Sequence, residues 1–191
     1  MTPIEELIQN FQALVAHVPE LLQPVIVLLA GAVPFIEGEG AAGIGIIGGI
    51  HPVIAGIAGA LGNFLAVVIV VWVADRTRRA VIGRRREVRA VAMAGAPEGG
   101  SAPVLPDTFV DEPKAESKGR RRFLRWLDRF GVPGASILGP LAIPTHITSA
   151  LLVSVGVSRG RVIFWQGVAI VLWTALIVVL AWLALNALVG A

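Results

Sequence analysis

The chain has 191 residues, no cysteine and a net charge of +3, and 55% of its residues are hydrophobic, which gives a mean hydropathy of +0.79. Soluble domains are less apolar, so the composition predicts an integral membrane protein, and the absence of cysteine excludes disulfides and thiolate metal sites. All 16 lysines and arginines lie between residues 76 and 161, so we expect the middle of the chain to face the cytoplasm and not to bind nucleic acid.

Residues 1–82 contain three predicted membrane elements, which together form a first repeat. Apolar side chains at helical spacing predict an amphipathic helix over residues 3–18 that lies in the membrane interface. The apolar run 21–50 is interrupted by EGEG, and each arm is too short to cross the hydrocarbon, which predicts a re-entrant hairpin. No basic residue flanks this hairpin, so we expect it to open outward. Residues 53–74 predict a full transmembrane helix.

Residues 120–191 repeat this order of elements as a second repeat. An interfacial helix over residues 120–130 precedes the apolar run 132–157, which is interrupted by GPLAIPTH and predicts a second re-entrant hairpin. Arginines flank this hairpin on both sides, so it is expected to open to the cytoplasm. The apolar run 162–190 predicts the second transmembrane helix. Between the repeats, residues 83–119 are rich in Ala, Pro, Gly and charge and predict a disordered cytoplasmic linker.

The two repeats are related by a weak internal similarity. A shift of 107 residues aligns FIEGEGAAGIGIIGG with AIPTHITSALLVSVG, pairs Gly49 with Gly156 and sets Glu39 opposite His146. Each repeat crosses the membrane once, so the copies are inverted in the membrane and both termini are expected outside the cytoplasm. The predicted fold class is therefore an all-α, multi-pass plasma-membrane protein of two inverted repeats. Four membrane-inserted elements enclose little volume, so a homodimer is also expected.

Two acidic residues interrupt the first hairpin. In a regular helix Glu37 and Glu39 would lie about 200° apart, so one carboxylate would face lipid at a high cost in free energy. We expect Gly38 and Gly40 to unwind the backbone, so that both acids face one internal proton and substrate site. Burial and mutual repulsion then disfavour two negative charges, so at least one acid should carry a proton. Glu37 is the favoured proton carrier, while the helix expected to begin near Ala41 holds Glu39 ionised. Alternatively, the acids only cap that helix at an aqueous mouth.

The second hairpin offers the complementary polar groups. Pro140 and Pro144 each prevent a continuous helix, so they are the expected hairpin-breaking residues together with the two glycines of the first hairpin. His146 suits a proton relay, or it is a packing residue. Thr145 is placed either to satisfy backbone carbonyls freed by the break or to contact a polar substrate. Asn63 is the only strongly polar side chain of its apolar run, and it either lines the same cavity or bridges two helices.

Enzyme motifs are absent from the sequence. It contains no GxSxG, no HExxH and no P-loop, so we expect no enzymatic activity, no cofactor and no metal. Broken apolar segments at corresponding positions of two repeats are typical of the binding site of a secondary transporter. We therefore expect a small transporter that couples protons to a small-molecule or lipid substrate within the lipid bilayer. Substrate, direction and stoichiometry are not set by the sequence.

The chain resembles the small multidrug export protein family in four features. They are the motif PFIEGEGAAGIGIIGGIHP, a later GN, a basic linker and the stretch RFGVPGASILGPLAIPTHITSALLVSVGVSRGRVIFW. More distantly, residues 25–185 are similar to the DedA membrane proteins, whose paired re-entrant hairpins carry acids in the first half. The resemblance implies that Glu37 and Glu39 correspond to those acids, which are associated with proton-coupled transport and with the return of polyprenyl-phosphate carriers. DedA proteins carry arginines in the second hairpin, whereas this chain has Pro144, Thr145 and His146 there.

Two alternative functions remain open at the level of the sequence. A DedA-like flippase or scramblase would move polyprenyl-phosphate or other lipids, and it would need cations at the tip of the second hairpin. A non-transporting membrane scaffold would instead dock partners through the linker.

Overall fold

The structure is a computed structural model of the whole chain. It describes residues 6, 9–10, 12–13, 15–94 and 118–189. These residues contain no strand, so the all-helical class is confirmed for the described part of the chain. The predicted interfacial helix 3–18 lies partly outside it; within the described residues, Ala16 N donates to Gln12 O at 2.9 Å, as in a helix.

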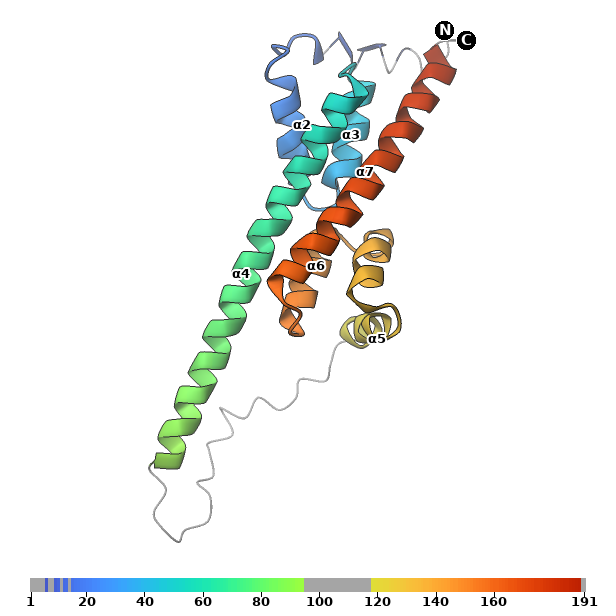
Figure 1. The fold of residues 1–191 in the computed structure, drawn as a ribbon. Coiled ribbons are helices and arrows are strands. Elements are labelled where there is room, and N and C mark those ends of the chain that lie inside the picture. Colours follow the sequence, from blue (N-terminus) through green and yellow to red (C-terminus); the bar gives the residue numbers. More distant parts are fainter. Residues whose placement is uncertain (1–5, 7–8, 11, 14, 95–117, 190–191) are drawn as a thin grey trace.

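Two long helices form the frame of the molecule. They are α4 (Pro52–Ala94) and α7 (Arg159–Val189), which lie side by side and slant in the same direction (Figure 1). Both are long and apolar enough to span a membrane, which agrees with the apolar runs 53–74 and 162–190. Arg159 ties the two helices together, because its guanidinium lies 3.8 Å from Asp75 Oδ2 and 4.8 Å from the centre of the Trp72 ring.

The helix α4 is longer than the sequence predicted. It continues to Ala94, so the assignment of residues 83–94 to a disordered linker is wrong. The reason is local: after the apolar run, arginines alternate with Ala, Val and Glu, and most of these residues favour a helix. An ion pair of 3.0 Å between Asp75 and Arg79, one turn apart, adds to this preference. Residues 95–117 of the linker lie outside the described residues.

A first helical pair packs on the upper half of α4 (Figure 1). It consists of α2 (Gln23–Gly31) and α3 (Glu37–Ile47), and residues 32–36 form the turn between them. The predicted break at EGEG is therefore wrong, and Gly38 and Gly40 lie inside α3. Pro34 has no N–H to continue a helix, whereas acids are favourable in a first helical turn, so the chain turns before EGEG instead.

Glycines allow this pair to lie directly against the backbone of α4. A Cβ atom at Gly59 would lie 2.6 Å from Gly38 O, and one at Gly31 would overlap Gly59 O. A Cβ atom at Gly62 would likewise overlap Leu28 O. Backbone contacts as close as these are available only to glycine.

A second helical pair packs on the lower half of α7. Its first helix, α5 (Lys118–Leu138), is broken at Gly131 (φ 65°, ψ −172°), so that the basic part before the break lies across the bundle and the part after it turns along α7 (Figure 1). The 3-10 helix η1 (Gly139–Leu141), which contains Pro140, and then Pro144 separate α5 from α6 (Thr145–Ser154). Trp173 of α7 holds the end of α5, because its Nε1 donates to Ile137 O at 2.8 Å.

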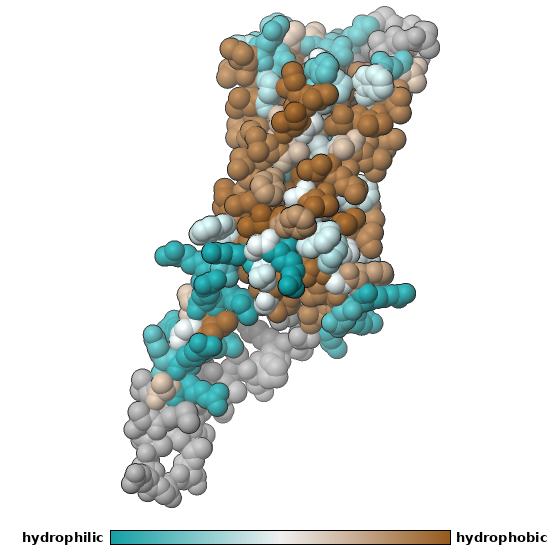
Figure 2. All heavy atoms as spheres, in the orientation of Figure 1, coloured by the Kyte–Doolittle hydropathy of each residue, from teal (hydrophilic) through white to brown (hydrophobic). Residues whose placement is uncertain are grey.

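Charge and hydropathy divide the molecule along its length. On the face shown in Figure 2, a broad apolar band covers the bundle, and polar residues gather beyond it at both ends. Large apolar side chains of α2, α4 and α7 are exposed in this band, among them Leu29, Ile57, Ile69, Phe164 and Val171. We call the end formed by residues 76–89, 118–129 and 159–161 the arginine-rich end. The ends of α3 and α7 lie at the opposite end.

Candidate functional site

The tips of the two helical pairs meet at the carboxylate of Glu37. This side chain is 5% exposed, and one of its oxygens, Oε1, is surrounded by three donor groups. The backbone N–H of Thr145 donates at 2.6 Å and the hydroxyl of Thr145 at 2.7 Å. Nδ1 of His146 lies 3.3 Å away. These contacts join residues that are more than 100 positions apart in the sequence.

Two helix N-termini create this arrangement. Glu37 is the first residue of α3 and Thr145 the first residue of α6, so the carboxylate from one helix start caps the free N–H of the other. The N-terminus of a helix carries a partial positive charge that attracts an anionic group. Glu37 adopts a left-handed conformation with φ 54°, which is uncommon for a residue with a side chain and characteristic of functional sites.

Asn63 of α4 completes one side of the site. Its Oδ1 lies 3.1 Å from the Thr145 hydroxyl, and the side chain is fully buried. A hydroxyl has a single hydrogen, so the bonds of Thr145 to Glu37 and to Asn63 compete with each other. Nδ2 of Asn63 is buried and has no partner among the described residues. Asn63 therefore touches the site, and its amide has hydrogen-bonding capacity left over.

His146 forms a buried pair with Glu37. Their contact needs one hydrogen, either on Nδ1 of His146, which then donates to the carboxylate, or on the carboxyl group, which then donates to Nδ1. Nε2 is buried and has no partner within the described part of the chain. The histidine and the carboxylate can thus hold one proton between them, either as an ion pair or as two neutral groups.

Glu39 is not part of this cluster. Glu39 lies in the first turn of α3, two residues after Glu37. It makes none of the contacts to Thr145, His146 or Asn63, and its Oε2 is buried without a partner in the described structure. The structure thus brings together four of the five predicted site residues and leaves Glu39 outside.

Four further buried polar side chains lack partners among the described residues. They are Ser136, Thr148, Gln166 and Thr174. The sequence analysis gave none of them a role, although polar residues within apolar runs were a visible signal. Thr174 lies beside the site, because a Cβ atom at Gly38 would be 2.7 Å from its Oγ1. Both polar atoms of the Gln166 amide are unpartnered.

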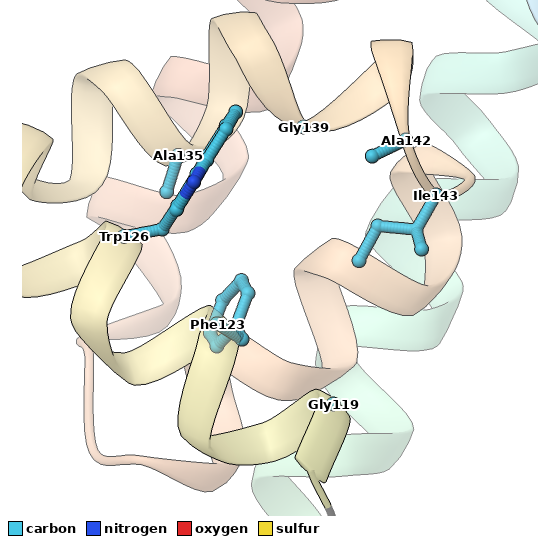
Figure 3. Close-up of a pocket in the computed structure, with 7 residues that line it drawn as sticks. All are labelled: Gly119, Phe123, Trp126, Ala135, Gly139, Ala142 and Ile143. Carbon is cyan, nitrogen blue, oxygen red and sulfur yellow. The ribbon is translucent and has the colours of Figure 1, made fainter.

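A separate cavity of about 320 Å³ opens under the basic part of α5. Figure 3 shows Phe123 and Trp126 of α5 on one side, and Ala142 and Ile143 of the segment between η1 and α6 on the other. Gly139 forms part of the wall between them. The lining is apolar and includes none of the residues around Glu37.

Fold and site together define a helical protein with two candidate membrane spans and a buried carboxylate where two helix starts meet. No group of three or more His, Asp or Glu residues in the described part of the chain could hold a metal ion. No family model, curated protein or solved structure matches the chain.

Proposed function

We propose that this protein is a small proton-coupled membrane transporter in which Glu37 binds protons and substrate in turn. The observation that carries the proposal is the carboxylate of Glu37, a residue that is 5% exposed and whose Oε1 lies between two helix starts, which the proposal puts inside the membrane. An ionisable group in that position is costly, so a functional role is the default explanation. His146, Thr145 and Asn63 line the same site.

The membrane arrangement proposed here is that of two inverted repeats with re-entrant hairpins. It is supported by the register of the elements, because the shift of 107 residues relates the start of α4 to the start of α7. The same shift relates the last residues of α3 and α6, and it pairs Gly49 (φ 90°) with Gly156 (φ 104°). In this arrangement the arginine-rich end faces the cytoplasm and both termini lie on the other side.

Proton coupling follows from the competition for one oxygen. With Glu37 ionised, the N–H and hydroxyl of Thr145 and Nδ1 of His146 make charge-assisted hydrogen bonds to it. A proton on the carboxylate weakens these bonds and loosens the contact between the two tips. A polar or cationic substrate that binds Glu37 therefore competes with the proton, and either one changes how firmly the two tips are held together.

The site favours a small molecule over a phosphorylated lipid. The protein groups within hydrogen-bonding distance of Glu37 or Thr145 include no lysine or arginine among the described residues, and His146 is the only side chain there that can become cationic. A phosphate would be repelled by Glu37 and would find no bidentate arginine partner. We therefore propose transport of a small molecule, as in the small multidrug export proteins that the chain resembles, and not the flipping of a phosphorylated lipid.

Reconstituted vesicles test the proposal. Proteoliposomes with an internal pH dye and an imposed pH gradient should show proton flux that increases when ethidium, a lipophilic cation, is added as a probe. Glu37→Gln should abolish the ethidium-dependent flux, because the amide cannot exchange a proton. Glu20→Gln, at an exposed position, is the matched control and should retain it. Equal flux in the Glu37→Gln variant and the unmodified protein would refute the proposal.

A further inference from the structure

We infer that in this conformation water reaches Glu37 from the arginine-rich end alone, along a path lined by Ser136, Thr148 and Gln166. The inference rests on the proposed function only for the use of the path, which would deliver protons to the transport site. The hydration of the path does not depend on the proposed function and can be tested separately.

The first observation is an asymmetry in the buried side chains. Beyond the Glu37 site toward the arginine-rich end, the interior contains four buried hydroxyl or amide side chains, on α5, α6 and α7. They are Ser136, Thr148, Ser149 and Gln166. Toward the opposite end, the buried residues of α2, α3 and the start of α4 are small or apolar, such as Val27, Ala41, Ala42, Ile46 and Ala55, while the partly buried Glu39, in the first turn of α3, is a polar exception.

Gln166 is the strongest indicator of water. It is fully buried, yet neither polar atom of its amide has a partner among the described residues. Leaving an amide unpaired in an apolar core is costly, and buried waters normally satisfy such groups. Thr174 lies beside Gly38 at the level of the site, and Gln166 is eight residues before it, so about 12 Å closer to the arginine-rich end.

Thr148 and Ser136 continue the polar lining on the other two helices. Both are fully buried, and neither hydroxyl has a hydrogen-bond partner in the described structure. Their neighbours Ala135 and Leu152 share one core cluster with Val162 and Ile170, which flank Gln166. Residues close to all three polar groups on their helices therefore belong to one core. Ser149 differs, because its hydroxyl already donates to Thr145 O at 2.7 Å.

His146 connects this path to the carboxylate. Nδ1 contacts Glu37, which leaves Nε2, buried and unpartnered within the described residues, as the ring atom that can bond to a water. A proton that reaches Nε2 can be passed on as the hydrogen on Nδ1 is given to Glu37. The path therefore ends at a group that can relay protons.

The opposite side is closed by backbone contact. The backbones of α2, α3 and α4 touch at glycines. A methyl group added at Gly31 would collide with Gly59 O, and one added at Gly59 would collide with Gly38 O. A methyl group at Gly62 would collide with Leu28 O. At these contacts between α2, α3 and α4 there is no space for a water molecule. Glycine contacts thus form the barrier on one side of the site, and polar side chains form the path on the other.

The chain contains no cysteine, so single-cysteine variants test the inference without removing native thiols. Ser136→Cys and Thr148→Cys report on the path, and Ala41→Cys and Ala55→Cys are matched controls at fully buried positions of the other half. Each variant is reconstituted in vesicles and treated with a charged methanethiosulfonate on one side. We expect both path cysteines to react at least about tenfold faster than both controls, and only from the side of the arginine-rich end.

Adding Gln166→Leu should slow the reaction at the cysteine of Thr148→Cys several-fold, while the thermal melting of the doubly substituted protein stays cooperative. Equal rates in both halves, or a faster reaction from the opposite side, would overturn the inference. If one path variant fails to fold, the other still reports. Absence of proton flux together with one-sided labelling would refute the proposed function and leave the hydrated path standing.

Discussion

The hydrogen bonds to Glu37 predict a specific loss of stability when the Thr145 hydroxyl is removed. Thr145→Val keeps the shape of the side chain and the backbone N–H but deletes the donor at 2.7 Å. Thr174→Val is a matched control, because Thr174 is equally buried but its hydroxyl has no partner among the described residues. The difference between the two variants separates the hydrogen bonding of the Thr145 hydroxyl to Glu37 and Asn63 from the general effect of replacing a buried threonine.

The size of the effect follows from the charge of the acceptor. A hydrogen bond to a charged group contributes about 1.5–3 kcal/mol, and hydrogen bonds within membrane proteins reach about 1.7 kcal/mol. Two donors, from Thr145 N and His146, remain on the same oxygen and soften the loss. We therefore expect Thr145→Val to lower the free energy of unfolding by about 1.5 kcal/mol, which lowers Tm by about 3–6 °C for a chain of this length.

The assay is thermal unfolding in detergent, followed by the fluorescence of the five tryptophans. Thr174→Val should melt within about 1–2 °C of the unmodified protein, because it deletes no protein hydrogen bond. If Thr145→Val and Thr174→Val melt together, the Thr145 hydroxyl does not stabilise the carboxylate of Glu37. The reasoning that a hydrogen bond between these two side chains joins the two helical pairs would then be refuted.

Three other substitutions test the frame of the bundle. Gly59→Ala should destabilise by about 1–3 kcal/mol, since its methyl group would meet Gly38 O, whereas Gly43→Ala, with its nearest atom at 3.9 Å, should be neutral or stabilising in the same melts. Asp75→Asn releases the arginine that joins α4 to α7, so Tm should fall slightly at low salt and less at high salt. Trp173→Phe should cost about 0.5–1.5 kcal/mol, seen as a lower denaturation midpoint, by leaving a carbonyl at the end of α5 unpaired.

Hydrophobic length predicted much of the fold. The two long helices lie where apolar runs of spanning length predicted them, because only helix length and composition were needed. The break between α5 and α6 also falls within GPLAIPTH, where two prolines act locally. The end of α4 was misjudged, since arginine-rich sequence was read as linker although its residues favour a helix.

The site depended on contacts that local sequence does not specify. EGEG was expected to be unwound because two acids on one helix would otherwise diverge, yet the helix does continue and the acids do diverge. What stabilises Glu37 is a backbone N–H at Thr145, supplied from the other half of the chain. No periodicity or motif near residue 37 encodes that partner. The internal alignment brought His146 to the right region but placed it opposite Glu39.

The bond between Glu37 and Thr145 also has a consequence for biosynthesis. Its two residues are 108 positions apart, so at ribosomal speed the partner of the acid is made roughly 5–20 s after the acid itself. In the proposed membrane arrangement, the first half would reach the membrane during that interval with an uncapped carboxyl group, which is more easily kept near the headgroups than in the hydrocarbon. Insertion of the proposed first hairpin to its final depth would then be completed only when the second half arrives.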